Sequence, residues 1–89
     1  MEINEIKMND GKNMPEKKFS TGAISATIWK NEKKTEDGKE FDFQTITLQR
    51  AYQDKDGQWK HTASLRVNDL PKATLVLQKA YEYIVLRNE

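Results

Sequence analysis

Residues 46–67, which run ITLQRAYQDKDGQWKHTASLRV, decide how this chain is expected to fold. The Asp-Lys-Asp-Gly run is typical of a tight turn, and the residues on either side of it alternate between apolar and polar side chains. A turn centred between Lys55 and Asp56 sets the register of the flanking strands. It pairs Tyr52 with Trp59, Arg50 with His61, Leu48 with Ala63 and Ile46 with Leu65. The sequence therefore predicts an antiparallel hairpin built from residues 40–52 and 59–67.

A strand precedes this hairpin and a helix follows it. Residues 22–30 alternate between apolar and polar side chains with the period of two that is typical of a strand, and residues 31–39 form a charged loop. After Val67 the pattern changes, because Asn68 or Asp69 can cap a helix. The helix is expected to end near Leu86 and to pack on the sheet through Leu70, Ala73, Leu77, Ala80, Tyr81 and Ile84.

These elements predict an α+β fold, in which an antiparallel sheet of three to four strands is followed by one long C-terminal helix packed on one face. A chain of 89 residues suits a single domain, which we expect to cover residues 18–89. Residues 1–17 contain few strongly apolar side chains and are interpreted as a flexible leader or a short edge strand around Ile3–Met8.

The helix carries more apolar surface than one sheet face needs. Beyond the arc that meets the sheet, apolar residues stand to one side of it and nearly opposite it. The simplest partner for this surplus surface is another copy of the same helix. The sequence therefore predicts a homodimer whose interface includes Val76, Tyr83, Leu75 and Leu86.

Composition excludes several classes of function. The chain has no cysteine and one histidine, so it offers no thiolate metal site and no nucleophile with a base and an orienting group. We expect no enzyme activity, no metal site, no cofactor and no small-molecule substrate. No stretch approaches the roughly 18 apolar residues of a membrane span, and no signal-peptide core is present, so the expected compartment is the cytoplasm. The net charge of +1 means that nucleic-acid binding would need a local surface.

The sheet face opposite the helix offers such a surface. The helix side is expected to hold Ile24, Ala26, Ile28, Ile46, Leu48, Ala63, Leu65 and Val67. On the other side, aromatic rings stand among hydroxyl groups, an amide and cations, which is the combination that single-stranded nucleic acid needs for stacking and phosphate contacts. The expected binding residues are Trp29 and Phe43 for stacking, Lys30, Lys60 and Arg66 for phosphates, and Thr27, Thr45, Thr47 and Gln49 for hydrogen bonds.

Structural alternatives stand beside these assignments. Trp29 and Phe43 would equally form a cross-strand pair that stabilises the sheet, and threonines are common in strands for their β-propensity. Tyr52 and Trp59 either cap the core or border a groove. The lysines of the charged loop are interpreted first as a solvated surface and second as a phosphate clamp; they are Lys30, Lys33, Lys34 and Lys39.

Several short stretches resemble the positive-cofactor-four family of transcriptional coactivators and its Whirly-like relatives. Phe19-Ser-Thr-Gly22 resembles the opening Phe-x-x-Gly of the family, and residues 46–52 resemble its Ile-x-Ile-Arg-x-Tyr strand. The turn at 56–60 resembles its acidic-Gly turn, and residues 63–70 resemble the segment that leads into its helix. The loop at 31–39 is longer than in the family, and Lys60-His-Thr-Ala replaces its Pro-Gly-Lys-Lys-Gly run.

The resemblance implies a helix-mediated dimer that binds single-stranded or melted DNA on curved sheet surfaces. It also implies a DNA contact at Arg50, although the predicted register places that residue on the helix side. We therefore expect a protein that binds single-stranded nucleic acid, DNA rather than RNA, with little sequence specificity and a role linked to transcription or DNA maintenance. The alternative is a protein-interaction or assembly module of the same fold that does not bind nucleic acid.

Overall fold

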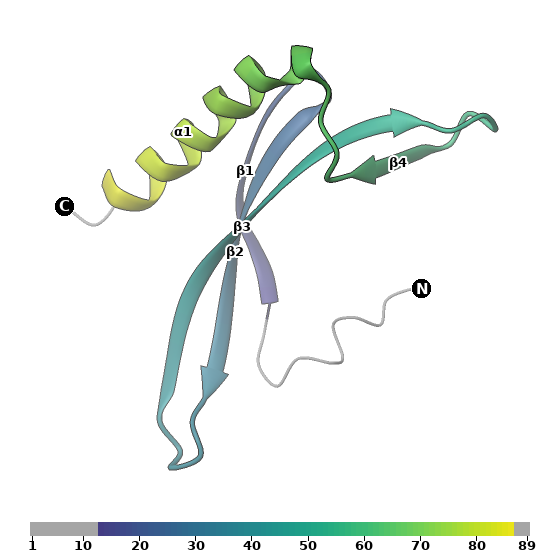
Figure 1. Ribbon diagram of the computed structural model, residues 1–89. Coiled ribbons are helices and arrows are strands. Elements are labelled where there is room, and N and C mark those ends of the chain that lie inside the picture. The colour runs from purple at the N-terminus through teal and green to yellow at the C-terminus, as the bar shows by residue number, and fades with distance from the viewer. Residues whose placement is uncertain (1–12, 87–89) are drawn as a thin grey trace.

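The computed structural model describes residues 13–86, which form a four-stranded antiparallel sheet and one C-terminal helix (Figure 1). The strands lie in the order β1-β2-β3-β4, so each strand pairs with its neighbour in the sequence. The elements are β1 (Asn13–Thr21), β2 (Ile24–Lys34), β3 (Glu40–Gln53), β4 (Trp59–Thr62) and α1 (Leu70–Leu86). The predicted α+β class, with a long helix after the sheet, is confirmed.

The core is a small contact between the middle of the sheet and the helix. Its sheet side is formed by three alternate residues of β2, and its helix side includes two alanines, whose small side chains let α1 approach the strands closely. Within residues 13–86, the buried apolar residues are Ile24, Ala26, Ile28, Ala73, Val76 and Ala80. Phe19 of β1 and Tyr83 of α1 extend this core with an edge-to-face ring contact of 6.2 Å.

The helix lies over β1 and β2 and barely touches β3. Val76 and Tyr83 therefore point toward the sheet, whereas Leu77 and Tyr81, which the periodicity placed inward, are 41% and 61% exposed. Leu70, another residue of the predicted arc, is also exposed. The predicted helix face is wrong because β1 was not expected as a full strand. Phe19 of β1 packs against Tyr83, so the Val76 and Tyr83 side of α1 faces the β1 edge of the sheet.

β1 begins earlier than the predicted domain boundary at residue 18. Thr21 pairs with Ile24 across a two-residue turn, and Gly22 adopts a φ of +60° at the first turn position, where glycine is favoured. Lysines, Pro15 and an irregular register near Pro15 hide the apolar pattern of this strand. The possible edge strand at 3–8 lies outside the described residues.

The predicted register of the β3–β4 hairpin is wrong by one residue. Gln53 pairs with Trp59 and Tyr52 pairs with Lys60. A backbone hydrogen bond from Asp54 to Gln58 extends the pairing, so the loop contains three residues, 55–57, instead of the expected two. Gly57 has a φ of +82°, which a three-residue loop with a bulge requires. Since side chains alternate across a strand, the shift carries Trp59 to the face opposite the helix and Lys60 to the helix side.

β4 ends at Thr62 instead of continuing to residue 67. The chain leaves the sheet there, so Ala63 is exposed and Val67 is 80% exposed, while Leu65 still packs against the core. This departure brings Ser64 and Asp69 to the side of β3 on which Arg50 lies. The residues that were expected to pair with β3 up to Val67 therefore form a connection, which ends in a 3-10 turn at Val67–Asp69.

Arg50 holds this connection in place. Its Nε donates a hydrogen bond to the carbonyl of Ser64 (3.1 Å) and lies 3.5 Å from Oδ2 of Asp69. The same carboxylate accepts a hydrogen bond from the backbone N–H of Arg66 (2.8 Å) at the start of the helical region. The side chains of Arg50 and Asp69 are only 16% and 17% exposed, so the contact is shielded from solvent. Arg50 therefore has a structural role in joining β3 to the start of α1.

Replacing Arg50 by alanine is expected to lower the free energy of unfolding by about 1.5–3 kcal/mol, because a hydrogen-bonded, largely buried charge pair is lost. The control is Lys34→Ala, which removes an ion pair with Glu40 whose side chains are 63% and 77% exposed. That change is expected to cost less than about 0.5 kcal/mol. Urea denaturation of both variants measures the difference, and equal losses would contradict the role given to Arg50.

Candidate nucleic-acid interface

The outer face, defined as the side of the sheet that α1 does not cover, is identified by strand alternation. Ile24, Ala26 and Ile28 point toward the helix. The β2 residues that alternate with them therefore point away from the helix, and so do the β3 residues that pair with those alternating residues. The outer face carries Thr27, Trp29, Asn31 and Lys33 on β2, Phe41, Phe43, Thr45, Thr47 and Gln49 on β3, and Trp59 and His61 on β4. Six predicted binding residues therefore share one face: Thr27, Trp29, Phe43, Thr45, Thr47 and Gln49.

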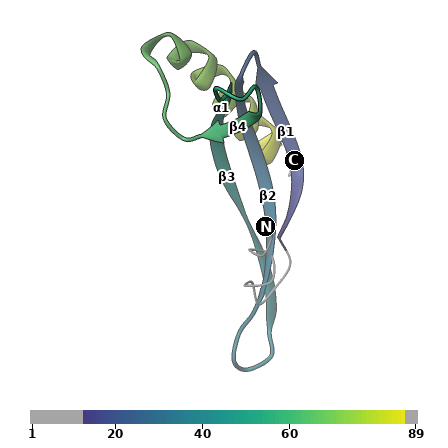
Figure 2. The same ribbon diagram turned by 90° about the vertical axis from the view of Figure 1, so that its right-hand side faces the viewer.

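Much of this face lies on a long extension that we call the β2–β3 arm, residues 30–44. Figures 1 and 2 show the arm continuing well beyond the end of the helix as a narrow, twisted ribbon. Its turn is closed by backbone hydrogen bonds between Thr35 and Gly38 and between Thr35 and Lys39. The side-chain hydroxyl of Thr35 also bonds to Asp37, and this bond lowers the pKa of the Asp37 carboxyl. The arm is thus an ordered hairpin, whereas the sequence predicted a loop at 31–39.

Trp29 is held on the outer face by a hydrogen bond across the sheet. Its indole Nε1–H donates to Oγ1 of Thr47 at 3.0 Å, and its direct neighbour on β3 is Thr45. The bond fixes the edge of the ring, while the half-buried side chain still presents surface to solvent. Thr47, predicted as a ligand contact, therefore positions the tryptophan. A ring fixed in this way loses little freedom when a base stacks on it.

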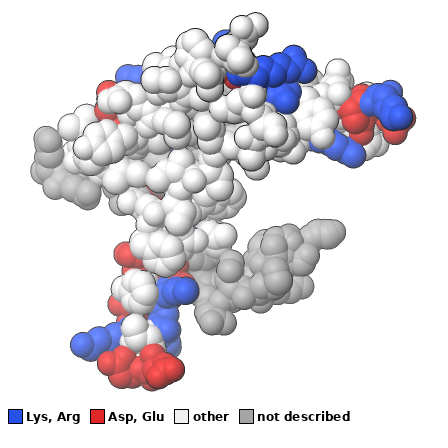
Figure 3. All heavy atoms as spheres, in the orientation of Figure 1, with Lys and Arg blue, Asp and Glu red and all other residues white. Residues whose placement is uncertain are grey.

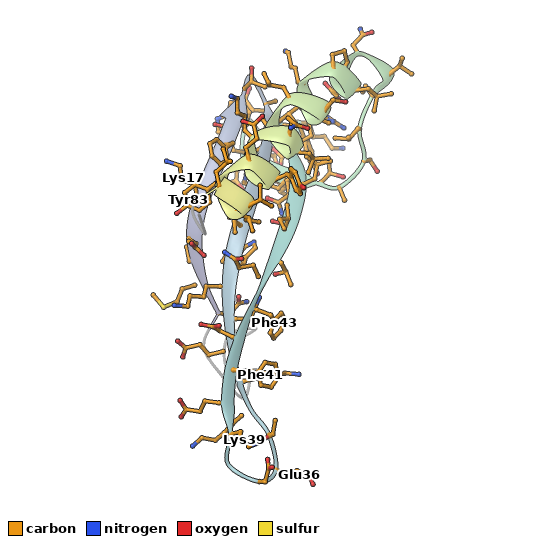
Figure 4. All side chains as sticks on the ribbon, turned by 90° about the vertical axis from the view of Figure 1, so that its left-hand side faces the viewer. Lys17, Glu36, Lys39, Phe41, Phe43 and Tyr83 are labelled. Atoms are coloured by element: carbon orange, nitrogen blue, oxygen red, sulfur yellow. The ribbon has the colours of Figure 1, made fainter. Side chains whose placement is uncertain are left out.

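Phe43 forms its ring contact with Phe41, at a centroid distance of 6.1 Å and an interplanar angle of 30°. In the described part of the chain there is no ring contact between Phe43 and Trp29, so the alternative cross-strand pair is not formed. Phe41 and Phe43 are 47% and 40% exposed, and Figure 4 shows both rings projecting to the same side of the arm. Together with Trp29 they form an aromatic row on the outer face.

Phe41 and Lys33 belong to the outer face but were not among the expected binding residues. Phe41 was placed correctly in a strand, and it stands two residues from Phe43, which is the spacing of one face. Lys33 pairs with Phe41 across the arm and has no ion-pair partner among residues 13–86. The sequence did contain a signal for Lys33: when the alternation of residues 24–30 is extended through residue 34, Lys33 falls on the same face as Trp29.

The two faces of the arm differ sharply in charge. On the helix side, Lys30 lies 3.7 Å from Asp42 and Lys34 lies 3.8 Å from Glu40, so both cations are already paired. The outer face at positions 31, 33, 41 and 43 holds one lysine and no carboxylate. Figure 3 shows charged side chains of both signs gathered at the arm's tip. Lys33, which forms no ion pair within residues 13–86 and pairs with Phe41 across the arm, is therefore the strand cation beside the aromatic row.

The other predicted cations do not join this face. Lys30 and Lys60 point to the helix side, and Arg50 is engaged with Ser64 and Asp69. Lys60 lies 3.3 Å from the carboxylate of Asp54. Hydrogen bonds from the backbone N–H groups of Gln58 and Asp56 to this carboxylate lower the pKa of Asp54, so it is a ready partner for Lys60 at neutral pH. Arg66 lies in the connection between β4 and the 3-10 turn and is not part of a strand.

Two of the four predicted dimer residues lie in the core, and the other two are exposed. Val76 is 2% exposed and Tyr83 packs against Phe19, so both belong to the core of the single chain. Leu75 and Leu86 are exposed. The flank of α1 that faces β3, away from Phe19, carries a different apolar row, formed by Leu70, Leu77, Tyr81 and Val85.

No protein-family model, no curated protein and no solved structure matches this chain. Within residues 13–86, no group of three histidine, aspartate or glutamate side chains is placed to hold a metal ion. Across the same range, no helix has the length and apolar character needed to cross a membrane. The outer face thus stands on its own geometry as the candidate site.

Adjacent residues test the assignment of the two faces. Ile28→Ala is expected to lower the free energy of unfolding by about 2–5 kcal/mol, because it removes a fully buried side chain. Trp29→Ala is expected to cost only about 1 kcal/mol, since it mainly removes one hydrogen bond at the surface. Thermal or urea denaturation measures both. A larger loss for the tryptophan variant would mean that the two faces are inverted.

Proposed function

We propose that this protein binds single-stranded nucleic acid, DNA in preference to RNA, on the outer face of its sheet. The observation that carries the proposal is the aromatic row of Trp29, Phe43 and Phe41 beside the unpaired Lys33, on a surface of the arm that has no carboxylate. Bases stack on the rings, and the lysine ammonium contacts a phosphate. This arrangement requires bases that are free of a duplex, because only unpaired bases expose their ring faces.

Stacking also explains why little sequence specificity is expected. Every base has an aromatic face, so a row of rings accepts any sequence with similar energy. The hydroxyl groups of Thr27 and Thr45 and the amide of Gln49 offer hydrogen bonds along the same path. The resemblance to the positive-cofactor-four family agrees with this use of a sheet face and supports a role in transcription or DNA maintenance.

The proposal includes a homodimer formed through the helix, but with a different set of residues from the one expected. Leu77 and Tyr81 are exposed on α1, and Ile46, on the helix side of β3, is 41% exposed. Leu48 of β3 packs against the core, but Ile46 on the same side stays partly uncovered, and the described residues 13–86 contain six buried apolar residues. The same flank of a second copy supplies the missing apolar cover.

A second candidate function is a protein-interaction module. Leu75 and Leu86 are 50% and 56% exposed on a side of α1 that faces neither β3 nor the outer face of the sheet. Apolar side chains in that position favour contact with another polypeptide. This function predicts a partner that is lost on Leu75→Glu, together with no salt-dependent binding of oligonucleotides.

Substitutions of two neighbouring lysines, one on each face of the arm, test which face binds nucleic acid. Lys33→Ala is expected to reduce the slope of log affinity against log salt by about 0.7, the contribution of one phosphate contact on a single strand. Lys34→Ala, on the opposite face and paired with Glu40, is expected to leave the slope unchanged. Fluorescence anisotropy with a labelled single-stranded oligonucleotide at several salt concentrations measures both slopes. Equal slopes for the two variants would remove the arm from the site.

The aromatic row is tested by Phe41→Ala, which is expected to weaken single-strand binding by about 1–3 kcal/mol through the loss of one stacked base. The ring is exposed, so the thermal transition of the variant is expected to stay close to that of the original protein. Competition by duplex DNA of the same length provides the control. Unchanged affinity with the fold intact would exclude stacking on the arm.

The dimer is tested with two leucines of one helix. Leu77→Glu is expected to shift the protein toward the monomer, because it places a charge in the proposed apolar contact. Leu75→Glu makes the same chemical change on a different side of α1 and is expected to leave the dimer intact. Sedimentation velocity measures both variants. A monomeric original protein, or equal effects of the two substitutions, would contradict a dimer formed through this flank.

A further inference from the structure

Asn31 stands within the aromatic row with its amide held in one orientation. It lies on the outer face of β2, two residues from Trp29 and directly across from Phe43. Its Nδ2 donates hydrogen bonds to Oγ1 of Thr45 (3.1 Å) and to the backbone carbonyl of Phe43 (3.4 Å). A backbone carbonyl only accepts, so the nitrogen of the amide must be the atom that faces β3.

The carbonyl end of this amide has no partner in the described part of the chain. No hydrogen bond to Oδ1 of Asn31 is formed by any residue in the range 13–86. Both amide hydrogens are directed to β3, so Asn31 can present only an acceptor to a molecule on the outer face. Residues two apart on one face of a strand are about 7 Å from each other. A base stacked on Trp29 or Phe43 therefore has an edge within reach of this oxygen.

The four bases differ in what they offer to a fixed acceptor. Cytosine, adenine and guanine carry an exocyclic amino group, which donates a hydrogen bond from the edge of the ring. Uracil and thymine offer only the ring N3–H, and two carbonyl oxygens flank it. An acceptor that approaches this N–H is repelled by both oxygens. A base with an exocyclic amino group thus satisfies Asn31 at a lower electrostatic cost.

We propose that Asn31 gives the site a preference for bases with an exocyclic amino group, cytosine, adenine and guanine over uracil and thymine. The inference rests on the proposed function and adds a selection between base edges to a surface on which stacking accepts every base. Stacking supplies most of the affinity, and the Asn31 oxygen changes the relative affinities of the bases that stack there. Thr45 and the Phe43 carbonyl act as positioning groups, because they hold the amide in the orientation that leaves only an acceptor exposed.

Two matched homopolymers test this preference. Oligo(dC) and oligo(dU) of about 20 nucleotides have the same ring size and backbone and differ at the base edge, so their affinities isolate the edge contact. Near neutral pH, the original protein is expected to bind oligo(dC) about 3- to 10-fold more tightly, the effect of one net hydrogen bond. Asn31→Ala is expected to bring the ratio close to one while changing the affinity for oligo(dU) far less.

The control variant is Asn68→Ala, the same chemical change in the 3-10 turn before α1, which is expected to keep the ratio of the original protein. Equal binding of both homopolymers by the original protein overturns the preference but leaves the proposed function standing. A preference that survives Asn31→Ala also overturns it, because another group must then read the base. Absence of binding to either homopolymer at low salt overturns the proposed function, and this inference with it.

Discussion

The contact between one face of β2 and three small or medium side chains of α1 sets the remaining geometry. Ile24, Ala26 and Ile28 must face the helix to be buried, and strand alternation then forces their neighbours to the outer face. Trp29 lies half-buried on that face for this reason and not because of a local preference. The same contact centres the helix on β1 and β2, which leaves Ile46 on β3 uncovered. One packing choice therefore creates both the candidate binding face and the candidate dimer surface.

Alternation along β2 and the middle of β3 was predictable from sequence, and it placed Trp29, Phe43 and Thr47 correctly on one face. The β3–β4 register was not predictable to within one residue, because two- and three-residue loops fit the same Asp-Lys-Asp-Gly run. That single residue decides the positions of Trp59 and Lys60. It removes a predicted phosphate ligand from the outer face and adds an exposed tryptophan to it.

Side-chain contacts between distant segments account for the other differences. Nothing in the local pattern indicates that Arg50 is occupied by Ser64 and Asp69, since both partners come from a segment that was expected to be strand and cap. The orientation of α1 likewise depends on Phe19, in a strand whose lysines and proline mask its alternation. Periodicity identified the apolar residues of the helix correctly, but their direction depends on which strand they meet. The free acceptor of Asn31 was also not predictable from the local pattern, because its orientation depends on hydrogen bonds to Thr45 and Phe43 on the neighbouring strand.

The length of the β2–β3 arm affects how it can respond to a bound strand. Beyond Asn31 the arm pairs only two strands within the described range, and its ion pairs are exposed to solvent. A ribbon of this kind opens at a lower free-energy cost than the helix-covered sheet, because little apolar surface is exposed when its hydrogen bonds break. Closing of the arm and binding at its aromatic row are then thermodynamically linked, because a ligand that binds the closed ribbon suppresses its opening. Amide hydrogen exchange in the arm would therefore slow on binding more than in the helix-covered sheet.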